Sequence, residues 1–262
     1  MDTSSELAVE TADTHEGSAN DVAAGSDDPD ARHTTVRLVG TLTVTNAPGL
    51  AARLCGELTT HGAVVADASA LVVEDAVAVH AFADAVLEAG EWPDVRLALA
   101  TGDRETVRLL AASRVDQRVV VRPDVAAAVA ALGERPDLVR AFWYFDISEY
   151  APGTARAHVR RVCGRWAVDA EVCEAAEIVV TELVTNAVEH ASSRSLVEVE
   201  RRANAFRMTV RDYDTSSLPE AVLPPPSSSR GRGLAMVAAV SREWGVHHHT
   251  DGKTVWAEMA TA

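Results

Sequence analysis

The order of apolar segments changes at residues 133–137, GERPD, and this change restricts the folds open to the chain. Before it, short apolar runs alternate with segments of helical periodicity. After it, two helical segments precede adjacent segments in which apolar and polar residues alternate, as they do in strands. These two orders belong to different layer architectures. We therefore expect two domains, 34–132 and 138–262, joined by a linker at 133–137, and the length of 262 residues is sufficient for both.

Residues 34–132 are expected to form an α/β domain in which helices pack on a small sheet. A strand pair is predicted at 34–44, and single strands are predicted at 63–67, 95–100 and 118–121. Helices are predicted at 46–58, 74–90, 103–113 and 124–132. Asn46 and Asp103 stand where N-capping residues belong, and Gly90 stands where a helix ends.

The first 33 residues are acidic and contain few large apolar side chains. The chain has a formal net charge of −15, and residues 1–30 include no Lys or Arg. A segment of this composition cannot bury enough apolar surface to offset the entropy lost on folding. We expect residues 1–33 to be a disordered acidic tail.

Residues 138–262 are expected to form an α+β sandwich, an antiparallel sheet with helices on one side. Strands are predicted at 139–146, 195–202 and 205–212, and helices at 151–166, 169–191 and 231–240. A final hairpin, 243–250 and 254–260, turns through Asp251-Gly252. The Pro- and Ser-rich stretch between residues 213 and 231 is expected to be an irregular loop.

The segment TELVTNAVEH, 181–190, places polar side chains on one side of an otherwise apolar helix. Residues four apart lie about 40° from one another around a helix, so Glu182, Asn186 and His190 form one stripe, with Glu189 beside it. A solvated face of an ordinary amphipathic helix would explain this stripe. Asn is a mediocre helix former, however, and an amide one turn after a carboxylate offers a cation ligand next to a general base.

Two further segments fit a site that binds a nucleotide. Asp212 ends a predicted strand and can accept a hydrogen bond from an exocyclic amine. In SRGRGL, 229–234, Gly231 and Gly233 leave backbone amides uncovered at a helix start, which suits phosphates, and Arg230 and Arg232 add positive charge. We therefore include these residues, with Asn186 and His190, among the candidate nucleotide ligands.

With these motifs, residues 138–262 resemble the GHKL (Bergerat-fold) ATPases, and within them the anti-sigma factor serine kinases of actinobacteria. EIVVTELVTNAVEHA resembles the N box of that family, VRDYD and GRGLAMV its two glycine boxes, and GKTVWAEM its closing strand. The resemblance implies that Glu182 is the general base, that Asn186 binds Mg²⁺, and that Asp212 binds the adenine amine of ATP. It also implies that Thr254 supports Asp212 and that residues 219–230 form a lid over the phosphates.

The first glycine box departs from the family pattern D-x-G-x-G. This chain has Asp212-Tyr213-Asp214-Thr215-Ser216, with no glycine to let the backbone approach the nucleotide closely. Asp214 adds bulk and negative charge near an anion. The departure favours an alternative function, a non-catalytic protein-binding module with a degenerate nucleotide pocket.

Residues 34–132 resemble the STAS domain, the fold of anti-sigma factor antagonists, through VVADASALVVEDAVAVHAF at 64–82. Asp67 and Asp75 match the acids of that pattern. The family then has a phosphoacceptor serine, whereas this chain has Ala76-Val77-Ala78. A phosphorylation switch at this position is therefore not expected.

Together the resemblances imply a partner-switching regulator of transcription that phosphorylates or sequesters a STAS antagonist or a sigma factor. A protein serine/threonine kinase using ATP and Mg²⁺ is the enzyme expected, and homodimer formation is compatible with it. No signal peptide or membrane-spanning segment is predicted, so we expect a cytoplasmic protein without membrane contact. No basic patch with interleaved aromatic residues is present, so direct nucleic-acid binding is not expected.

Overall fold

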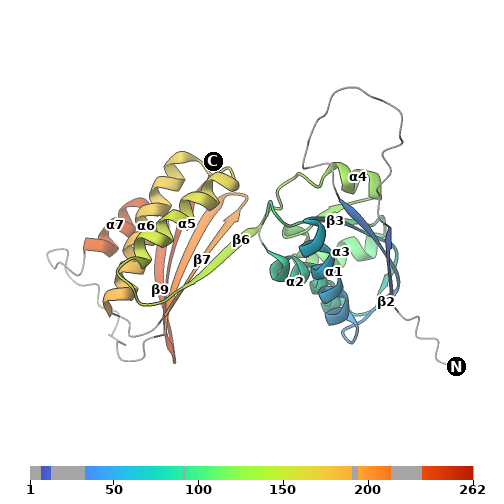
Figure 1. The fold of residues 1–262 in the computed structure, drawn as a ribbon, viewed down its shortest axis with the longest axis horizontal. Helices are drawn as coiled ribbons and strands as arrows, with labels where there is room; N and C mark the ends of the chain where they lie inside the picture. Colours follow the sequence, from blue (N-terminus) through green and yellow to red (C-terminus); the bar gives the residue numbers. More distant parts are fainter. Residues whose placement is uncertain (1–6, 13–32, 91, 191–193, 214–231, 262) are drawn as a thin grey trace, which may run out of the picture. The chain divides into compact units, whose positions relative to one another are not determined.

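The computed structural model describes residues 7–12, 33–90, 92–190, 194–213 and 232–261. The chain forms two compact units, Met1–Asp137 (unit 1) and Leu138–Ala262 (unit 2), shown in Figure 1. The division falls at the end of the linker expected at 133–137.

Unit 1 is built on a five-stranded sheet with the order β1-β2-β3-β4-β5. Its strands are β1 (Ala8–Ala12), β2 (Thr34–Leu42), β3 (Ala63–Val73), β4 (Arg96–Ala100) and β5 (Val120–Arg122). Strands β2 to β5 are parallel, and β1 pairs antiparallel with β2. Two expectations were wrong here. Residues 34–44 contain one strand rather than a pair, and the antiparallel partner is β1, which lies inside the predicted disordered tail. Leu7 and Val9 pack against the main core of the unit, which favours this edge strand despite the acidic surroundings.

Helices cover both faces of this sheet. They are α1 (Ala47–His61), α2 (His80–Ala89), α3 (Arg104–Ala112) and α4 (Val125–Ala130), with 3₁₀ turns at Ala76–Val79 and Val115–Gln117. The main core joins the first three helices to one face through residues such as Leu54, Phe82, Leu99 and Leu110. On the other face α4 packs through Ala128 against Val65, Ala98 and their neighbours. This layering confirms the expected α/β fold.

The predicted helix ends of unit 1 were partly right. Asp103 caps α3, because its carboxylate accepts from the backbone N–H of Thr106 at 2.8 Å. Asn46 precedes α1 but makes no side-chain bond to it. Its amide instead accepts from the N–H of Thr43 and donates to the carbonyl of Thr41, each at 2.9 Å. Asn46 thus stabilises the turn before α1 rather than the helix end.

Unit 2 contains a five-stranded antiparallel sheet with the order β6-β7-β8-β10-β9. Its strands are β6 (Val139–Phe145), β7 (Ser195–Arg202), β8 (Ala205–Asp212), β9 (Glu243–His249) and β10 (Gly252–Ala260). The helices α5 (Ala151–Arg165), α6 (Ala170–His190) and α7 (Arg232–Val240) lie on one face of this sheet, as Figure 1 shows. The expected α+β sandwich is confirmed.

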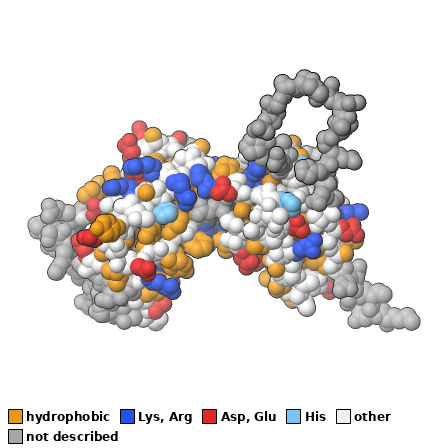
Figure 2. All heavy atoms as spheres, in the orientation of Figure 1, with side chains coloured by type: hydrophobic (Ala, Val, Ile, Leu, Met, Phe, Trp, Pro, Cys, Tyr) orange, Lys and Arg blue, Asp and Glu red, His pale blue; other side chains and the backbone are white. Residues whose placement is uncertain are grey.

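The two faces of this sheet differ in chemistry. The helix-covered face is apolar, and Phe206, Met208 and Val210 of β8 are buried there. On the opposite face the Arg207 guanidinium lies 4.2 Å from the centre of the Trp256 ring, and Arg140 pairs with Glu198 at 2.5 Å. In the view of Figure 2, basic and acidic side chains are interspersed over both units. Among the described residues, no helix is long and apolar enough to cross a membrane.

Candidate functional site

Several elements of unit 2 meet at one end of its sheet. Asp212, the last residue of β8, is paired with Ser195 at the start of β7 and with Lys253 near the start of β10. Helix α6 ends at His190, five residues before Ser195, so its last turns lie at the same end. The topology therefore brings the C-terminal part of α6 to the strand end that carries Asp212.

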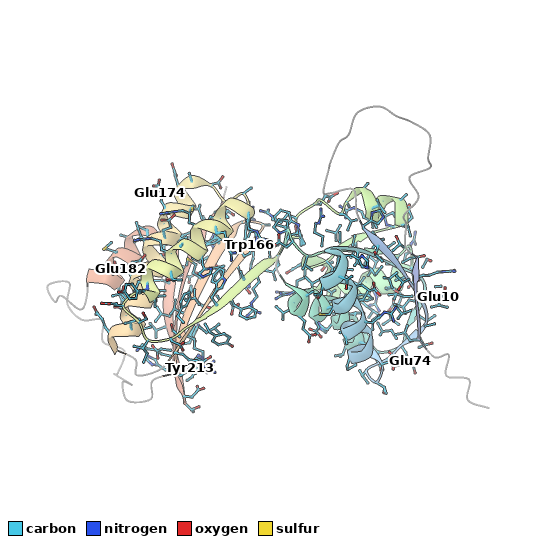
Figure 3. The ribbon with its side chains drawn as sticks, in the orientation of Figure 1. Glu10, Glu74, Trp166, Glu174, Glu182 and Tyr213 are labelled. Carbon is cyan, nitrogen blue, oxygen red and sulfur yellow. The ribbon has the colours of Figure 1, made fainter. Side chains whose placement is uncertain are left out.

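The start of α7 lies against the polar stripe of α6. A Cβ atom added to Gly233 would lie 2.6 Å from Glu182 Oε2 and 3.8 Å from Asn186 Nδ2. Glu182 and Asn186 are both half-buried, whereas Leu183 and Val184, on the apolar arc, are buried. Figure 3 shows Glu182 on α6 and Tyr213 just after the end of β8. Three of the candidate residues, Glu182, Asn186 and Gly233, are thus neighbours, and no side chain larger than hydrogen fits at position 233 without moving the carboxylate.

Asp212 is a buried carboxylate with one partnered oxygen. Asp212 lies on the helix-covered face of the sheet and is 3 % exposed. Its Oδ2 lies 3.2 Å from the Lys253 ammonium, and its Oδ1 has no hydrogen-bond partner among the described residues. Gly252 packs directly on the Asp212 backbone with φ of +142°, a conformation that favours glycine. The carboxylate is therefore held at the strand end by β10, with one acceptor that no described residue satisfies.

Thr254 does not support Asp212, and that expectation was wrong. It is paired with Arg211, on the other face of the sheet, and its hydroxyl lies 3.0 Å from His249 Nε2. Side chains alternate between faces along a strand, so an error of one residue moves a side chain to the opposite face. The residue beside Asp212 is Lys253, which the sequence reasoning missed. It is the only lysine of the chain and directly precedes Thr254, and counting back from the hairpin turn could have identified it.

Some expectations fall outside the described residues. These are the roles of Arg230, Gly231, Asp214 and the segment 219–230. His190 and Arg232 are placed as the last residue of α6 and the first of α7, but their side chains are not described.

In unit 1, the two acids of the STAS-like segment bind backbone amides. Asp75 Oδ2 accepts from the N–H of Val44 at 2.9 Å, and Asp67 Oδ1 accepts from the N–H of Ser69 at 3.0 Å. Ala76 is exposed at the start of a 3₁₀ turn. Near it, a hollow of about 450 Å³ lies between α1 and α2 and is edged by the exposed apolar side chains of Val44, Val77 and Leu87.

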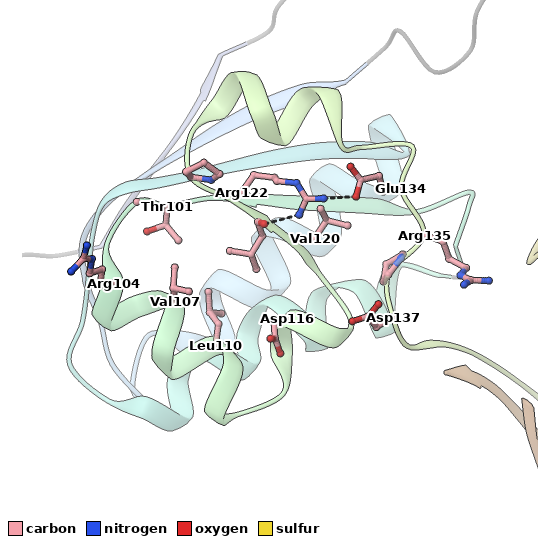
Figure 4. A pocket seen from close by; sticks show the side chains of 14 residues that line it. Thr101, Arg104, Val107, Leu110, Asp116, Val120, Arg122, Glu134, Arg135 and Asp137 are labelled. Carbon is pink, nitrogen blue, oxygen red and sulfur yellow. Dashed lines mark hydrogen bonds and ion pairs between the residues drawn. The ribbon is translucent and has the colours of Figure 1, made fainter. Parts of the chain in front are cut away.

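A second hollow of unit 1, about 580 Å³, lies at the carboxyl ends of β4 and β5 (Figure 4). Val107 and Leu110 of α3 form part of its wall. Its charged side chains have both signs, and Arg122 donates to the Val121 carbonyl and pairs with Glu134. This mixed charge of the lining, with Arg122 already engaged inside the protein, selects no particular ligand.

Comparison with known proteins identifies the C-terminal part of the chain. Residues 149–259 match the model of the histidine kinase-like ATPase domain. No curated protein matches the chain. Among solved structures, the RsbU and RsbW domains of a Mycobacterium tuberculosis protein share 20 % identity over 47 % of this chain, with a TM-score of 0.37. That match covers only 32 % of the mycobacterial chain.

Two other solved structures are similar to parts of the chain. An anti-sigma factor antagonist from Mycobacterium paratuberculosis shares 16 % identity over 48 % of this chain and 94 % of its own, with a TM-score of 0.37. The histidine kinase domain of a blue-light activated kinase from Erythrobacter litoralis EL346 shares 22 % identity over 44 % of this chain and 61 % of its own, with a TM-score of 0.28. By the family match, residues 149–259 of unit 2 belong to the histidine kinase-like ATPase domains.

Proposed function

We propose that unit 2 binds ATP with Mg²⁺ and transfers its terminal phosphoryl group to a serine of a partner protein. The observation that carries this proposal is the meeting of Glu182, Asn186 and Gly233 within a histidine kinase-like ATPase domain. The partner is a STAS-type antagonist, and a sigma factor is a second protein that this regulator would sequester.

The residues present fit a nucleotide. The unpartnered Asp212 Oδ1 is a buried acceptor that the exocyclic amine of adenine would satisfy. At the other end of the site, the start of α7 directs backbone amides and its positive dipole end toward phosphates, and Arg230, Gly231 and Arg232 precede or begin that helix. Asn186 supplies an amide oxygen for Mg²⁺, which takes few protein ligands when phosphates coordinate it. His190 lies one turn further along α6, close to the same ligand set.

Glu182 has the role of general base in this proposal. Its carboxylate accepts the proton of the serine hydroxyl as the serine oxygen bonds to the γ-phosphorus, and the bond to the bridging oxygen breaks to release ADP. Mg²⁺ held by Asn186 would supply neutralisation of the phosphate charge. The lack of a side chain at Gly233 leaves room for the carboxylate at the start of α7, where phosphate is expected.

Unit 1 has the role of a docking domain. The exposed Val44, Val77 and Leu87 around the hollow between α1 and α2 support this role, because contiguous apolar side chains at a surface mark interaction sites. Docking of a partner STAS protein or self-association into a homodimer would both cover this surface.

A second function, a non-catalytic binding module, is favoured by one observation. Residues 212–216 contain none of the glycines of the family pattern, so the backbone cannot approach a nucleotide as closely there. In that case the nucleotide site would only support the fold around a partner-binding surface.

The test is calorimetric titration of the full chain with ATP, with and without Mg²⁺, followed by a phosphoryl-transfer assay with labelled ATP. We expect Mg²⁺-dependent binding. Asn186→Ala should abolish the effect of Mg²⁺, whereas Glu182→Ala should retain ATP binding and lose transfer, because a base acts on the chemical step. Binding without transfer under all conditions would favour the non-catalytic module. No binding at millimolar ATP would reject the kinase and would leave the non-catalytic module with a degenerate pocket.

A further inference from the structure

Lys253 lies directly beside Asp212, within the proposed nucleotide site. The two residues are directly paired across β8 and β10, and their side chains lie on the helix-covered face. The ammonium lies 3.2 Å from Asp212 Oδ2, and the Lys253 side chain is 20 % exposed. The lysine is therefore packed at the strand end, and its side chain is partly exposed there.

The pair presents two complementary hydrogen-bonding groups side by side. An ionised carboxylate only accepts, and an ammonium only donates, with three hydrogens of which Asp212 needs one. The Watson–Crick edge of adenine has the opposite order, with a donor at the exocyclic amine and an acceptor at N1. Proteins that bind an unpaired base read it through hydrogen bonds to this edge.

Burial makes this arrangement selective. Asp212 Oδ1 lacks a partner, and a buried acceptor left without a donor is costly. Lys253 supplies the counter-charge that a carboxylate this buried requires, and its ammonium has further hydrogens to donate. A base that offers a donor to Asp212 and an acceptor to Lys253 satisfies both groups at once.

We propose that Lys253 is a specificity-determining residue of the nucleotide site, and that its ammonium donates to N1 of adenine while Asp212 accepts from the exocyclic amine. This inference rests on the proposed nucleotide binding of unit 2. It assigns the recognition of N1 to the Lys253 ammonium. The neighbouring Gly252 packs on the backbone of Asp212 and so keeps the two strands close together.

The test pairs variants of the full chain with ATP analogues that lack one atom of the base edge. Calorimetry would compare ATP, 1-deaza-ATP without the N1 acceptor, and purine riboside triphosphate without the amine, with 7-deaza-ATP as the analogue control. For the unaltered chain we expect 1-deaza-ATP to bind about tenfold or more weakly than ATP, and 7-deaza-ATP to bind like ATP.

The expected results separate a contact of Lys253 from a structural effect. In Lys253→Met the preference for ATP over 1-deaza-ATP should fall close to one, while the preference for ATP over the analogue without the amine remains. Lys253→Arg should retain part of the N1 preference. Arg211→Met removes a cation from the neighbouring position on the opposite face, where Arg211 pairs with Asp251 at 2.8 Å, and should change neither preference.

Three outcomes would overturn the inference. An unchanged N1 preference in Lys253→Met would mean that Lys253 does not contact the base. Loss of both preferences together, with a lower unfolding temperature, would show that Lys253 only maintains the fold around Asp212. Absence of ATP binding to the unaltered chain would overturn the proposed function itself, whereas ATP binding with equal affinity for 1-deaza-ATP would overturn the role of Lys253 alone.

Discussion

Gly233 is the residue where adding a single methyl group tests the position of the Glu182 carboxylate. A methyl group at this position would meet Glu182 Oε2 at 2.6 Å, and the neighbour it meets is the end of a flexible side chain rather than backbone. The carboxylate can therefore rotate away without unfolding α7. We expect Gly233→Ala to keep the fold and to lower phosphoryl transfer by about 100-fold, the scale of loss for a reacting group misplaced by about 1 Å.

Gly153 provides the matched control for this substitution. It also lies in the first turn of a helix, α5, but a Cβ atom there has no neighbour within 4 Å. Gly153→Ala should leave transfer unchanged and should stabilise the chain by less than about 1 kcal/mol. Equal transfer rates in the two variants, measured with labelled ATP, would show that the position of Glu182 does not limit the reaction.

At the scale of elements, α5 and α6 are joined by an ion pair whose strength depends on pH. Arg160 Nη2 lies 2.5 Å from Glu177 Oε2, and Cys173 Sγ lies 3.7 Å from Glu177 Oε1. The hydrogen bond from Arg160 lowers the pKa of Glu177 below its ordinary value of 4.5. A carboxylate with a depressed pKa in the folded state stabilises the fold above its unfolded pKa, and this contribution is lost as the pH falls through the folded pKa.

We therefore expect Glu177→Gln to lower stability at neutral pH and to lose this effect progressively below pH 4.5. Urea unfolding of both proteins across this range measures the difference. Glu174→Gln is the control, because Glu174 is exposed one turn earlier on α6, as Figure 3 shows. A difference between the unaltered chain and Glu177→Gln that stays constant with pH would mean that the charge of Glu177 contributes nothing across the two helices.

The elements could be predicted from the sequence where periodicity and end signals agree. Helix α6 and strands β7 and β8 follow from clear periods of 3.6 and 2, and Asp103 was a correct capping prediction. Strand β1 was missed, because a short edge strand gains its stability from pairing with β2, a long-range contact that local composition does not report.

Prediction of the site was limited in the same way, by strand pairing between segments that are distant in the sequence. Glu182 and Asn186 lie on one helix, so their spacing alone places them together. The pairing of Lys253 with Asp212 depends instead on the register between two strands that are separated by α7 and β9 in the sequence. Since one residue of register exchanges the two faces, Thr254 was predicted where Lys253 lies.

At the scale of the whole molecule, the chain joins a histidine kinase-like ATPase domain in unit 2 to a unit 1 that resembles the STAS domain. Unit 1 has an alanine where that family has a phosphoacceptor serine. Ala76 is exposed at the start of the 3₁₀ turn before α2, beside Asp75, and it has no hydroxyl. A phosphate at this place would add a charge of about −2 next to the apolar surface around Val77. Unit 1 therefore has no hydroxyl to be phosphorylated at this position.

We expect the full chain, incubated with labelled ATP and Mg²⁺, to leave residues 60–85 unlabelled and to label a separate STAS protein instead. Stoichiometric label within 60–85, mapped by mass spectrometry, would contradict this. Ala76→Ser supplies the converse measurement, because the serine restores only a hydroxyl on an exposed turn. If the serine becomes labelled, the ATP site is competent and the chain lacks only the acceptor. The other outcome is that ATP binds and the separate STAS protein is labelled, while the serine at position 76 remains unlabelled. In that case unit 2 acts on other molecules, and unit 1 serves as a constant docking surface that phosphorylation does not regulate.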